Sequence, residues 1–266
     1  MLTEKINITN QEILEIAVRQ SALDCNCREQ DFFRNENIVV LSKKNPKARK
    51  YIPLPLECDL VSYGSNIVAQ VSAELLHPVS SFLKENGDIH LFETPKLHLF
   101  DEFLQSFGLR SCYMAEYFLP DIEKFKLHTC AYAIRLLDAN ALEPLYLPQW
   151  SNALSSAENK ERDVCAVGAY DGDTLVGLAG CSADCDHMYQ IGVDVLPKYR
   201  AQGIAAAVTS RLAYEVFKLG KVPFYCAAWS NIISVKNALK CGFKPAWIEL
   251  TARKIEYVNE QNKNRR

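Results

Sequence analysis

The sequence predicts a mixed α/β (α+β) fold in two regions, an N-terminal region over residues 1–128 and a C-terminal region over residues 129–266. Two observations predict this class. Short apolar runs, some with the period of two that is typical of strands, alternate with apolar residues at helical spacing. A chain of 266 residues, 48% of them hydrophobic, is also long enough to bury two separate cores.

The patterns of the first region predict a smaller α+β domain. Asn86-Gly87 and Gly108 follow two of its expected helices, and glycine or asparagine at this place is typical of a helix end. We expect helices around residues 14–18, 78–84 and 97–107, and strands at 37–41, 67–71, 89–92 and 113–119.

In the second region, the boundaries between the expected elements are clearer. Asp171-Gly172 between two apolar runs is a strong hairpin signal. Ile204, Val208 and Leu212 recur at every fourth residue, as on one face of a helix. We expect strands at 132–136, 164–170, 174–180, 189–195, 223–229 and 246–252, an irregular helical stretch at 142–154, and helices at 203–220 and 232–241.

The junction between the expected strand 189–195 and the following helix carries the clearest chemical signal. Gly203 opens the helix, and the first amides of a helix lack internal partners and favour an anion. Arg200 adds a positive charge beside them. Since the P-loop and the dinucleotide fingerprint are both absent, the loop predicts a phosphate or pyrophosphate cradle of another type. The alternative is an ordinary turn in which the glycine has only a steric role.

Two linked motifs resemble those of the GNAT superfamily of N-acetyltransferases. The first is similar to motif A, V-x-P-x-Y-R-x-x-G-x-G/A, through Val195, Pro197, Tyr199, Arg200, Gly203 and Ala205. The second is similar to motif B, N-x-x-A-x-x-L-Y-x-x-x-G-F, through Asn231, Ser234, Asn237, Gly242 and Phe243. The resemblance covers about residues 131–254, and it implies a mixed, twisted sheet of the GNAT type.

This resemblance implies that acetyl-CoA is the co-substrate and that a primary amine accepts the acetyl group by direct attack. It implies that the main chain of Val193, Asp194 and Val195 binds the pantetheine arm. Asn231 is expected beside the thioester, or as the N-cap of the next helix, and the two roles are compatible. The pyrophosphate is expected on Arg200 and on the amides of Ala201, Gln202, Gly203, Ile204, Ala205 and Ala206.

The catalytic groups are less well indicated. Motif B often carries a proton-donating tyrosine where this chain has Ala238. Asp194 and Ser234 are the catalytic candidates that we name, as base and acid. The alternatives are Asp184 and Asp186 as base, and Ser230, Tyr225 and Cys226 as acid. Asp194 could instead point away from the substrate, and the other two aspartates could be loop formers. A non-catalytic acyl-CoA-binding or regulatory module is the competing function.

Parts of the N-terminal region are similar to those of two-part bacterial GNAT proteins, in which a smaller α+β region precedes the transferase domain. The similar segments are residues 62–69, 92–95 and 114–121. The resemblance suggests a wall for the acceptor site, lined by Glu93, Glu116 and Tyr117. The alternative is a domain for packing and homodimer formation.

Composition excludes some partners. A formal net charge of −2 is not the excess of positive charge that is typical of proteins that bind nucleic acid or an anionic membrane. Residues 1–5 lack a signal-peptide core and no apolar stretch is long enough to span a bilayer, so we expect a cytoplasmic protein with reduced cysteines. The close pairs Cys25/Cys27 and Cys181/Cys185, the second near His187, lack a further ligand pair, so we expect no metal.

Overall fold

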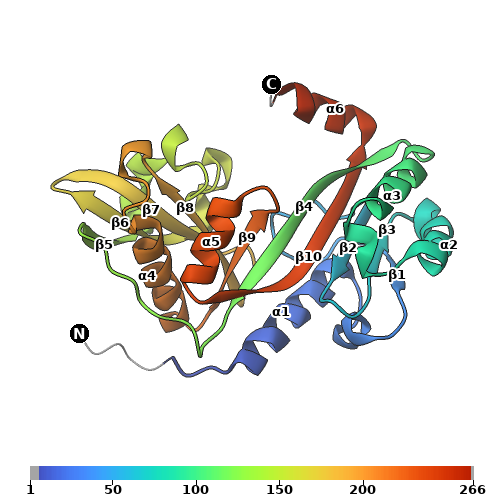
Figure 1. Ribbon diagram of the computed structural model, residues 1–266, viewed down its shortest axis with the longest axis horizontal. Coiled ribbons are helices and arrows are strands. Elements are labelled where there is room, and N and C mark those ends of the chain that lie inside the picture. The colour runs from blue at the N-terminus through green and yellow to red at the C-terminus, as the bar shows by residue number, and fades with distance from the viewer. Residues whose placement is uncertain (1–5, 265–266) are drawn as a thin grey trace. The chain divides into compact units, whose positions relative to one another are not determined.

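The computed structural model describes residues 6–264 and shows a mixed α+β fold, as the sequence predicts (Figure 1). The chain forms two compact units, and each consists of two stretches of chain. Unit 1 contains residues 6–17 and 118–245, and unit 2 contains residues 18–117 and 246–264. Within residues 6–264, no helix has the length and the apolar character that crossing a membrane requires.

These units differ from the consecutive division at residue 128 that the sequence predicts. The last strand, β10 (Phe243–Lys254), pairs antiparallel with the early strand β2 (Cys58–Ser62). Pairs such as Leu250↔Leu60 therefore place the end of the chain in the same unit as its early strands. Local patterns carry no information on such a long-range pairing. That segments 1–128 and 129–266 fold independently stays a prediction.

Unit 1 contains a five-stranded run in the order β9-β8-β7-β6-β5. Its pairings are antiparallel except for the parallel pair β8 and β9, which makes the run mixed. The strands are β5 (Ala133–Asp138), β6 (Asp163–Asp171), β7 (Thr174–Ser182), β8 (Met188–Val195) and β9 (Val222–Ala228). The predicted hairpin is confirmed, with Gly172 at a positive φ of 60° between β6 and β7.

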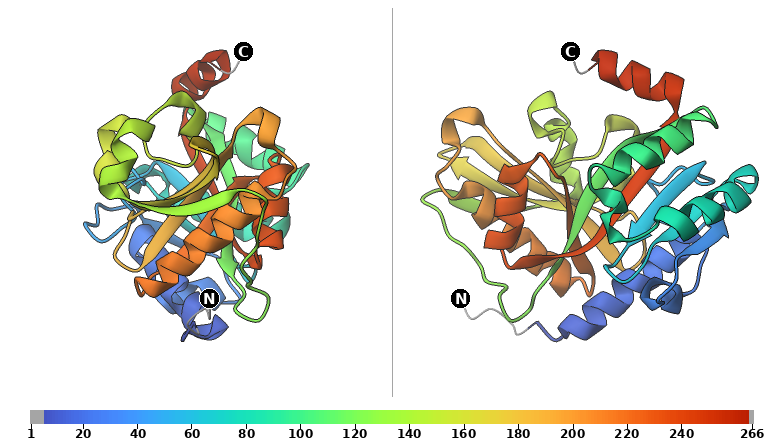
Figure 2. Two further views of the ribbon diagram at one scale, coloured as in Figure 1. Left: turned by 90° about the vertical axis from the view of Figure 1, so that its left-hand side faces the viewer. Right: turned by 45° about the vertical axis from the view of Figure 1, so that its right-hand side comes forward.

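The helix α4 (Ile204–Lys218) covers one face of this run (Figure 2). Its apolar side chains pack with those of β6, β7 and β8, and α5 (Ile232–Lys240) joins the same core through Ala238. A second core, centred on Trp150 and Leu178, lies between the strands and short 3₁₀ helices. These helices are η4 (Ala139–Leu145) and η5 (Pro148–Trp150), where the sequence predicts an irregular helical stretch at 142–154. A third, η6 (Ala157–Arg162), follows this stretch and has no buried residue.

Unit 2 contains the run β1-β3-β2-β10, in which β1 (Ile38–Leu41) and β3 (Val68–Val71) are parallel. Every residue of β2 and β3 is buried, so both faces of these strands are covered. One core joins the strands to α2 (Leu76–Asn86) and α3 (Lys96–Gln105). The remaining elements of the whole chain, from both units, are α1 (Asn10–Cys25), β4 (Leu109–Pro120), α6 (Ile255–Asn264) and the 3₁₀ helices η1 (Glu29–Phe33), η2 (Ala73–Leu75), η3 (Ile89–Phe92) and η7 (Pro197–Tyr199).

Three expectations for the elements are corrected. Residues 89–92, predicted as a strand, form η3, because Asp88 caps the backbone amide of His90 and favours a helical turn. The strand β2 was not predicted, since Asp59 interrupts its apolar pattern. The helix α6 was not predicted either, because its sequence is mostly polar and only Val258 is buried.

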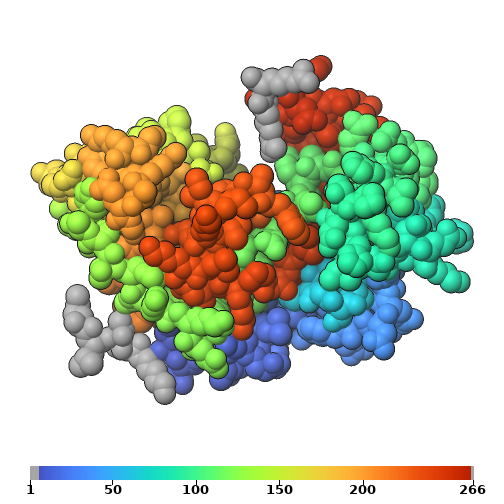
Figure 3. Space-filling view, viewed as in Figure 1, coloured from blue at the N-terminus to red at the C-terminus, as the bar shows by residue number. Residues whose placement is uncertain are grey.

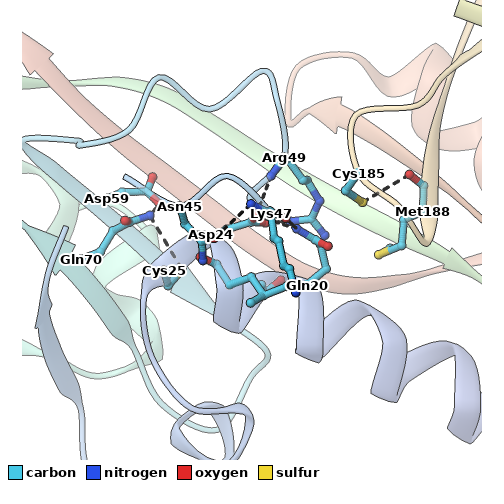
Figure 4. Close-up of polar contacts among 12 residues, drawn as sticks. Gln20, Asp24, Cys25, Asn45, Lys47, Arg49, Asp59, Gln70, Cys185 and Met188 are labelled. Atoms are coloured by element: carbon cyan, nitrogen blue, oxygen red, sulfur yellow. Dashed lines mark hydrogen bonds and ion pairs between the residues drawn. The ribbon is translucent and has the colours of Figure 1, made fainter. Parts of the chain in front are cut away.

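A buried polar cluster lies inside unit 2 (Figure 4). Asp59 accepts hydrogen bonds from Thr251 Oγ1 at 2.7 Å and from Gln70 Nε2 at 3.3 Å. Burial raises the pKa of Asp59 to about 6. Burial, together with the nearby charge of Asp59, raises the pKa of Glu249 to about 8. Near pH 7 the folded protein therefore holds a proton on Glu249 that the unfolded chain releases.

Replacing Glu249 by glutamine is expected to reduce the pH dependence of stability. The folded pKa lies above the ordinary value of about 4.3, so the native state binds more protons than the unfolded chain between about pH 4.3 and pH 8. This contribution to stability is complete below about pH 4.3 and is lost as the pH rises to 8. Urea unfolding at pH 5, 6.5 and 8 should show a smaller loss of free energy in Glu249→Gln, and no change in the exposed control Glu85→Gln. Equal slopes for all three proteins would show that Glu249 titrates normally.

Candidate functional site

The strands β8 and β9 part inside unit 1. Their parallel pairing extends from Met188↔Val222 to Ile191↔Tyr225. From Gly192 to Val195, β8 continues to pair with β7 on its other side, but within the described part of the chain it has no register with β9. The backbone of residues 192–195 therefore presents a free strand edge toward β9, and it includes the residues 193–195 that the resemblance assigns to the pantetheine arm.

The loop between β8 and α4 has an unusual backbone. Ala201 and Gly203 both have positive φ angles, of 60° and 82°. A positive φ is uncommon for a residue other than glycine, and strained backbone of this kind is often found at ligand sites. Gly203 is the N-cap of α4, and its oxygen accepts from the amide of Ala207 at 3.1 Å. The loop thus turns sharply into the helix and directs the first helical amides toward its concave side.

Two side-chain contacts hold this loop in place. The Arg200 side chain is exposed, and its Nε donates to the carbonyl of Val195 at 3.1 Å, which fixes a positive charge beside the end of β8. Tyr132 donates to Gln202 Oε1 at 2.5 Å. Ile204 packs tightly on β7, since a Cβ at Gly177 would lie 2.4 Å from its Cγ2. The loop thus combines a helix N-terminus with a guanidinium, and both are suited to phosphate groups.

The second predicted motif lies on α5. Asn231 is the N-cap of this helix, and its Oδ1 accepts from the backbone amide of Ser234 at 3.2 Å, so the expected capping role is confirmed. Burial raises the pKa of Tyr225, and the nearby side chains of Ser234 and Asn237 lower it by a smaller amount. Asn237 Nδ2 also donates to Thr209 Oγ1 at 3.0 Å, which ties α5 to α4.

The other predicted proton donors have different environments. Ala238, which stands where motif B often has a tyrosine, is fully buried in the core of unit 1. Cys226 is half-buried and receives a hydrogen bond from Gln190 Nε2 at 3.1 Å. Ser230 is exposed just before α5, whose orange-red surface faces the viewer in Figure 3. On this helix, Ile233 is 81% exposed. Tyr225 is thus the predicted donor that is buried and has polar side chains of α5 near its hydroxyl.

Asp194 has a set of partners that the sequence does not reveal. Its Oδ2 accepts from the backbone amides of Asn152 and Ala153 at 2.8 and 2.9 Å, and its Oδ1 accepts from Asn152 Nδ2 at 2.7 Å. The segment passes so closely that a Cβ at Gly192 would lie 1.8 Å from the Asn152 oxygen. These contacts give Asp194 a structural role, because they fasten this segment to β8. Its role as a general base stays a prediction.

The two alternative aspartates lie in the turn between β7 and β8. Asp184 is buried and accepts from Ser182 Oγ at 2.6 Å, which is typical of a side chain that shapes a turn. Asp186 is exposed, and its carbonyl accepts from Lys221 Nζ at 2.7 Å. Both arrangements agree with the expectation that these residues form a loop.

The N-terminal candidates are all in unit 2. Glu93 is exposed beside His90 Nδ1, at 3.3 Å. Glu116 is half-buried on β4, and Tyr117 is buried with its ring stacked on Trp247 at a centroid distance of 4.7 Å. The buried ring of Tyr117 thus belongs to the packing of unit 2, and the proposed role in an acceptor wall stays a prediction.

The predicted cysteine pairs lie in different surroundings. Cys181 belongs to a buried pair with Cys165, at an Sγ–Sγ distance of 3.6 Å across β6 and β7. Cys185 Sγ donates to the Met188 carbonyl at 3.4 Å (Figure 4). Over residues 6–264, no three His, Cys, Asp or Glu side chains are arranged to hold a metal ion.

Comparisons with known proteins agree with the motifs. The model of the GNAT acetyltransferase family matches residues 116–246. No curated protein matches the chain.

Solved structures give more distant similarities. A putative GNAT acetyltransferase from Novosphingobium aromaticivorans is 17% identical, with 55% of this chain and 66% of that chain covered and a TM-score of 0.44. A GCN5-related N-acetyltransferase-like protein from Streptococcus suis is 19% identical, with 60% and 69% covered and a TM-score of 0.44. YncA, a putative acetyltransferase from Salmonella typhimurium solved with acetyl-CoA, is 15% identical, with 47% and 94% covered and a TM-score of 0.36. The chain thus spans slightly less than two thirds of the Novosphingobium protein.

The family match includes β5 to β9, the loop at Gly203 and the helices α4 and α5, which carry both motifs. Residues 116–246 of this chain are therefore a GNAT acetyltransferase domain.

Proposed function

We propose that this protein is an N-acetyltransferase that moves the acetyl group of acetyl-CoA to a primary amine by direct attack. One observation supports this proposal most strongly. The free edge of β8 over residues 192–195 leads directly into the positive-φ loop that opens α4. A strand edge followed at once by a helix N-terminus offers hydrogen bonds to a chain of amides and then to phosphates, in the order in which coenzyme A carries them.

The residues of this chain fit such a ligand. The amides of residues 201–206, with the Arg200 guanidinium, would hold the pyrophosphate, and the backbone of residues 193–195 would bind the pantetheine arm. Asn231, at the start of α5, is the proposed contact near the thioester. Acetyl-CoA supplies an activated acyl thioester, so most of the protein's contribution is to orient the reactants and to manage protons.

We assign the proton that the leaving sulfur takes up to Tyr225. This residue is the last one of β9 that pairs with β8, so it lies where the two strands part. Ser234 and Asn237 of α5 lie near its hydroxyl, and burial raises its pKa, so the hydroxyl stays protonated at neutral pH. Tyr225 Oη would hold this proton in place of the tyrosine that is absent at Ala238. Ser234, the acid predicted from the sequence, becomes a positioning residue in this proposal.

Replacing Tyr225 by phenylalanine is expected to lower kcat by about 100-fold, the usual size of an acid–base contribution, without changing the Kd for acetyl-CoA. Steady-state thiol release gives kcat, and calorimetry gives the Kd. Tyr189→Phe on β8 is the matched control and should keep wild-type values. A Tyr225→Phe enzyme with normal kcat would exclude Tyr225 as the proton donor.

The competing function is a non-catalytic acyl-CoA-binding or regulatory module, which the buried Ala238 favours. A broad panel of small amines, aminoglycosides and lysine peptides separates the two proposals. Acetyl-CoA-dependent thiol release that needs one class of amine supports the enzyme. Tight acetyl-CoA binding with no release on any amine supports the binding module.

Two further parts of the proposal concern the protein's surroundings. A cytoplasmic location, where cysteine thiols stay reduced, is part of the proposal for this chain with its ten cysteines. The α+β region of two-part bacterial GNAT proteins suggests an acceptor wall or a homodimer contact for the N-terminal residues. If the N-terminal residues form an acceptor wall, replacing Glu93 and Glu116 by glutamine should change KM for the amine. If they form a homodimer contact, the same replacement should change the oligomeric state.

A further inference from the structure

The loop that follows β1 carries an unbalanced positive charge. Lys43, Lys44, Lys47 and Lys50 are all exposed. Within residues 6–264, none of these four side chains forms an ion pair. The loop thus differs from the nearby charged surface of unit 2, where anions are present but already neutralised.

The acidic residues of the same stretch, residues 19–50, all have arginine partners. These ion pairs are Asp24 with Arg49, Glu29 with Arg19 at 3.4 Å, Asp31 with Arg28 at 3.1 Å and with Arg34 at 3.0 Å, and Glu36 with Arg34 at 3.4 Å. The positive charge of the four lysines therefore remains available to a ligand.

Buried polar contacts fix this loop against α1 (Figure 4). Asn45 Nδ2 donates to the Leu23 carbonyl at 2.8 Å, and Gln20 Nε2 donates to the Lys47 carbonyl at 2.9 Å. The Arg49 guanidinium pairs with Asp24, and the Arg49 amide donates to the same carboxylate at 2.8 Å. Because the backbone of the loop is already ordered, a ligand that binds beside it has less conformational entropy to remove.

A pocket of about 490 Å³ lies beside the loop, within the size range of small-molecule sites. Ala22 and Leu23 of α1 and Ile38 and Val40 of β1 form its apolar wall. Asn26, Arg28, Asp31 and Asn45 contribute polar groups, and Asn45 connects the pocket to the lysine loop.

We propose that this pocket binds a small organic anion, such as a carboxylate or a phosphate ester, that also has an apolar portion. The apolar portion lies against Ile38 and Val40, and the positive charge of the loop that contributes Asn45 to the lining attracts the charged group. The concave wall favours a small molecule over nucleic acid or a membrane surface, and so does the net charge of −2 for the whole chain. This site belongs to unit 2 and is independent of the proposed acetyl transfer.

The fluorescent probe 8-anilinonaphthalene-1-sulfonate combines an apolar ring system with a sulfonate and tests this proposal on the full chain. Wild-type protein should bind it at one saturable site, in the presence of excess coenzyme A, and less tightly as salt increases. Lys43→Glu/Lys44→Glu should weaken this binding about tenfold or more, since four units of charge change beside the anion. Val40→Phe, which fills the pocket, should remove it.

The matched control is Lys84→Glu/Lys126→Glu, which changes the net charge equally at two exposed lysines outside the pocket. It should bind the probe as the wild type does, and so should Gly203→Leu. Equal weakening in both double variants would show a nonspecific charge effect and overturn the proposal. Unchanged affinity in Lys43→Glu/Lys44→Glu would also overturn it. Both lysine pairs are exposed, so thermal unfolding should confirm a wild-type fold before the comparison.

Discussion

Replacing Gly203 by leucine is expected to abolish acetyl-CoA binding, measured by calorimetry beside the wild type, while unit 1 stays folded. Gly203 has a φ of 82° and forms the N-cap of α4, so a side chain there projects beside the first amides of the helix. The nearest atoms to an added Cβ are Thr129 O at 3.8 Å and Cys130 Cβ at 4.0 Å, which is ordinary contact. The cost to folding is therefore limited to backbone strain of about 1–2 kcal/mol.

Gly220 provides the matched control for this variant. It follows the other end of α4 with a φ of 70°, and no atom lies within 4 Å of the Cβ that a substitution would add. Gly220→Leu thus carries a similar backbone strain at a position far from the proposed phosphate cradle along the helix. It should bind acetyl-CoA like the wild type. Normal binding by Gly203→Leu, or equal losses in both variants, would contradict the assignment of this loop.

Replacing Arg49 by methionine is expected to lower the free energy of unfolding by about 3–5 kcal/mol, the usual cost of removing one partner of a buried ion pair. Arg49 and Asp24 are almost fully buried, at 2% and 3% exposure. Without the guanidinium, the Asp24 carboxylate stays buried with hydrogen bonds from Gln20 and from the backbone, but without a paired cation. Urea unfolding measures the loss.

A double variant distinguishes the buried charge from lost packing. Asp24→Asn/Arg49→Met removes both charges and should regain much of the lost stability, because no buried ion remains. Lys96→Met, which breaks the exposed pair with Asp88, is the control and should cost at most about 1 kcal/mol. If Arg49→Met is no more destabilising than Lys96→Met, the pair does not hold the unit together.

Local signals in the sequence predicted much of unit 1. Asp171-Gly172 specifies its hairpin by turn chemistry alone, and Gly203 marks the start of α4 because few residues tolerate its backbone. Both signals depend on the residue itself, so they can be recognised without knowledge of the fold. The motif resemblance added the GNAT domain, which the match over residues 116–246 confirms.

Long-range contacts could not be predicted in this way. The pairing of β10 with β2 joins residues about 190 positions apart, for example Thr251 and Asp59, and it decides which residues form unit 2. The strand β2 could not be predicted from its sequence because it contains Asp59. A carboxylate in the sequence usually indicates a loop residue, and only its partners in the structure show that it is buried in a strand. The strand prediction at residues 89–92 failed for the opposite reason, since a local cap from Asp88 overrides the β propensity of the apolar run.

The candidate site shows the same limit. The sequence indicated the loop and the start of α5, but it could not order the proton donors. The structure distinguishes Tyr225, because Ser234 and Asn237 reach its hydroxyl from another element. The interpretation of Asp194 changed most, since its three hydrogen bonds come from Asn152 and Ala153, about 40 residues earlier in the chain.

Hydrogen exchange measured by mass spectrometry tests the central claim most directly, because it locates the bound co-substrate on the chain. At saturating acetyl-CoA, peptides that cover residues 191–208 should exchange more slowly, since the free edge of β8 and the first amides of α4 gain hydrogen-bond acceptors. Peptides from the hairpin of β6 and β7 should not change. The account would be contradicted if acetyl-CoA binds while exchange over residues 191–208 stays unchanged, or if the protection lies only in other segments.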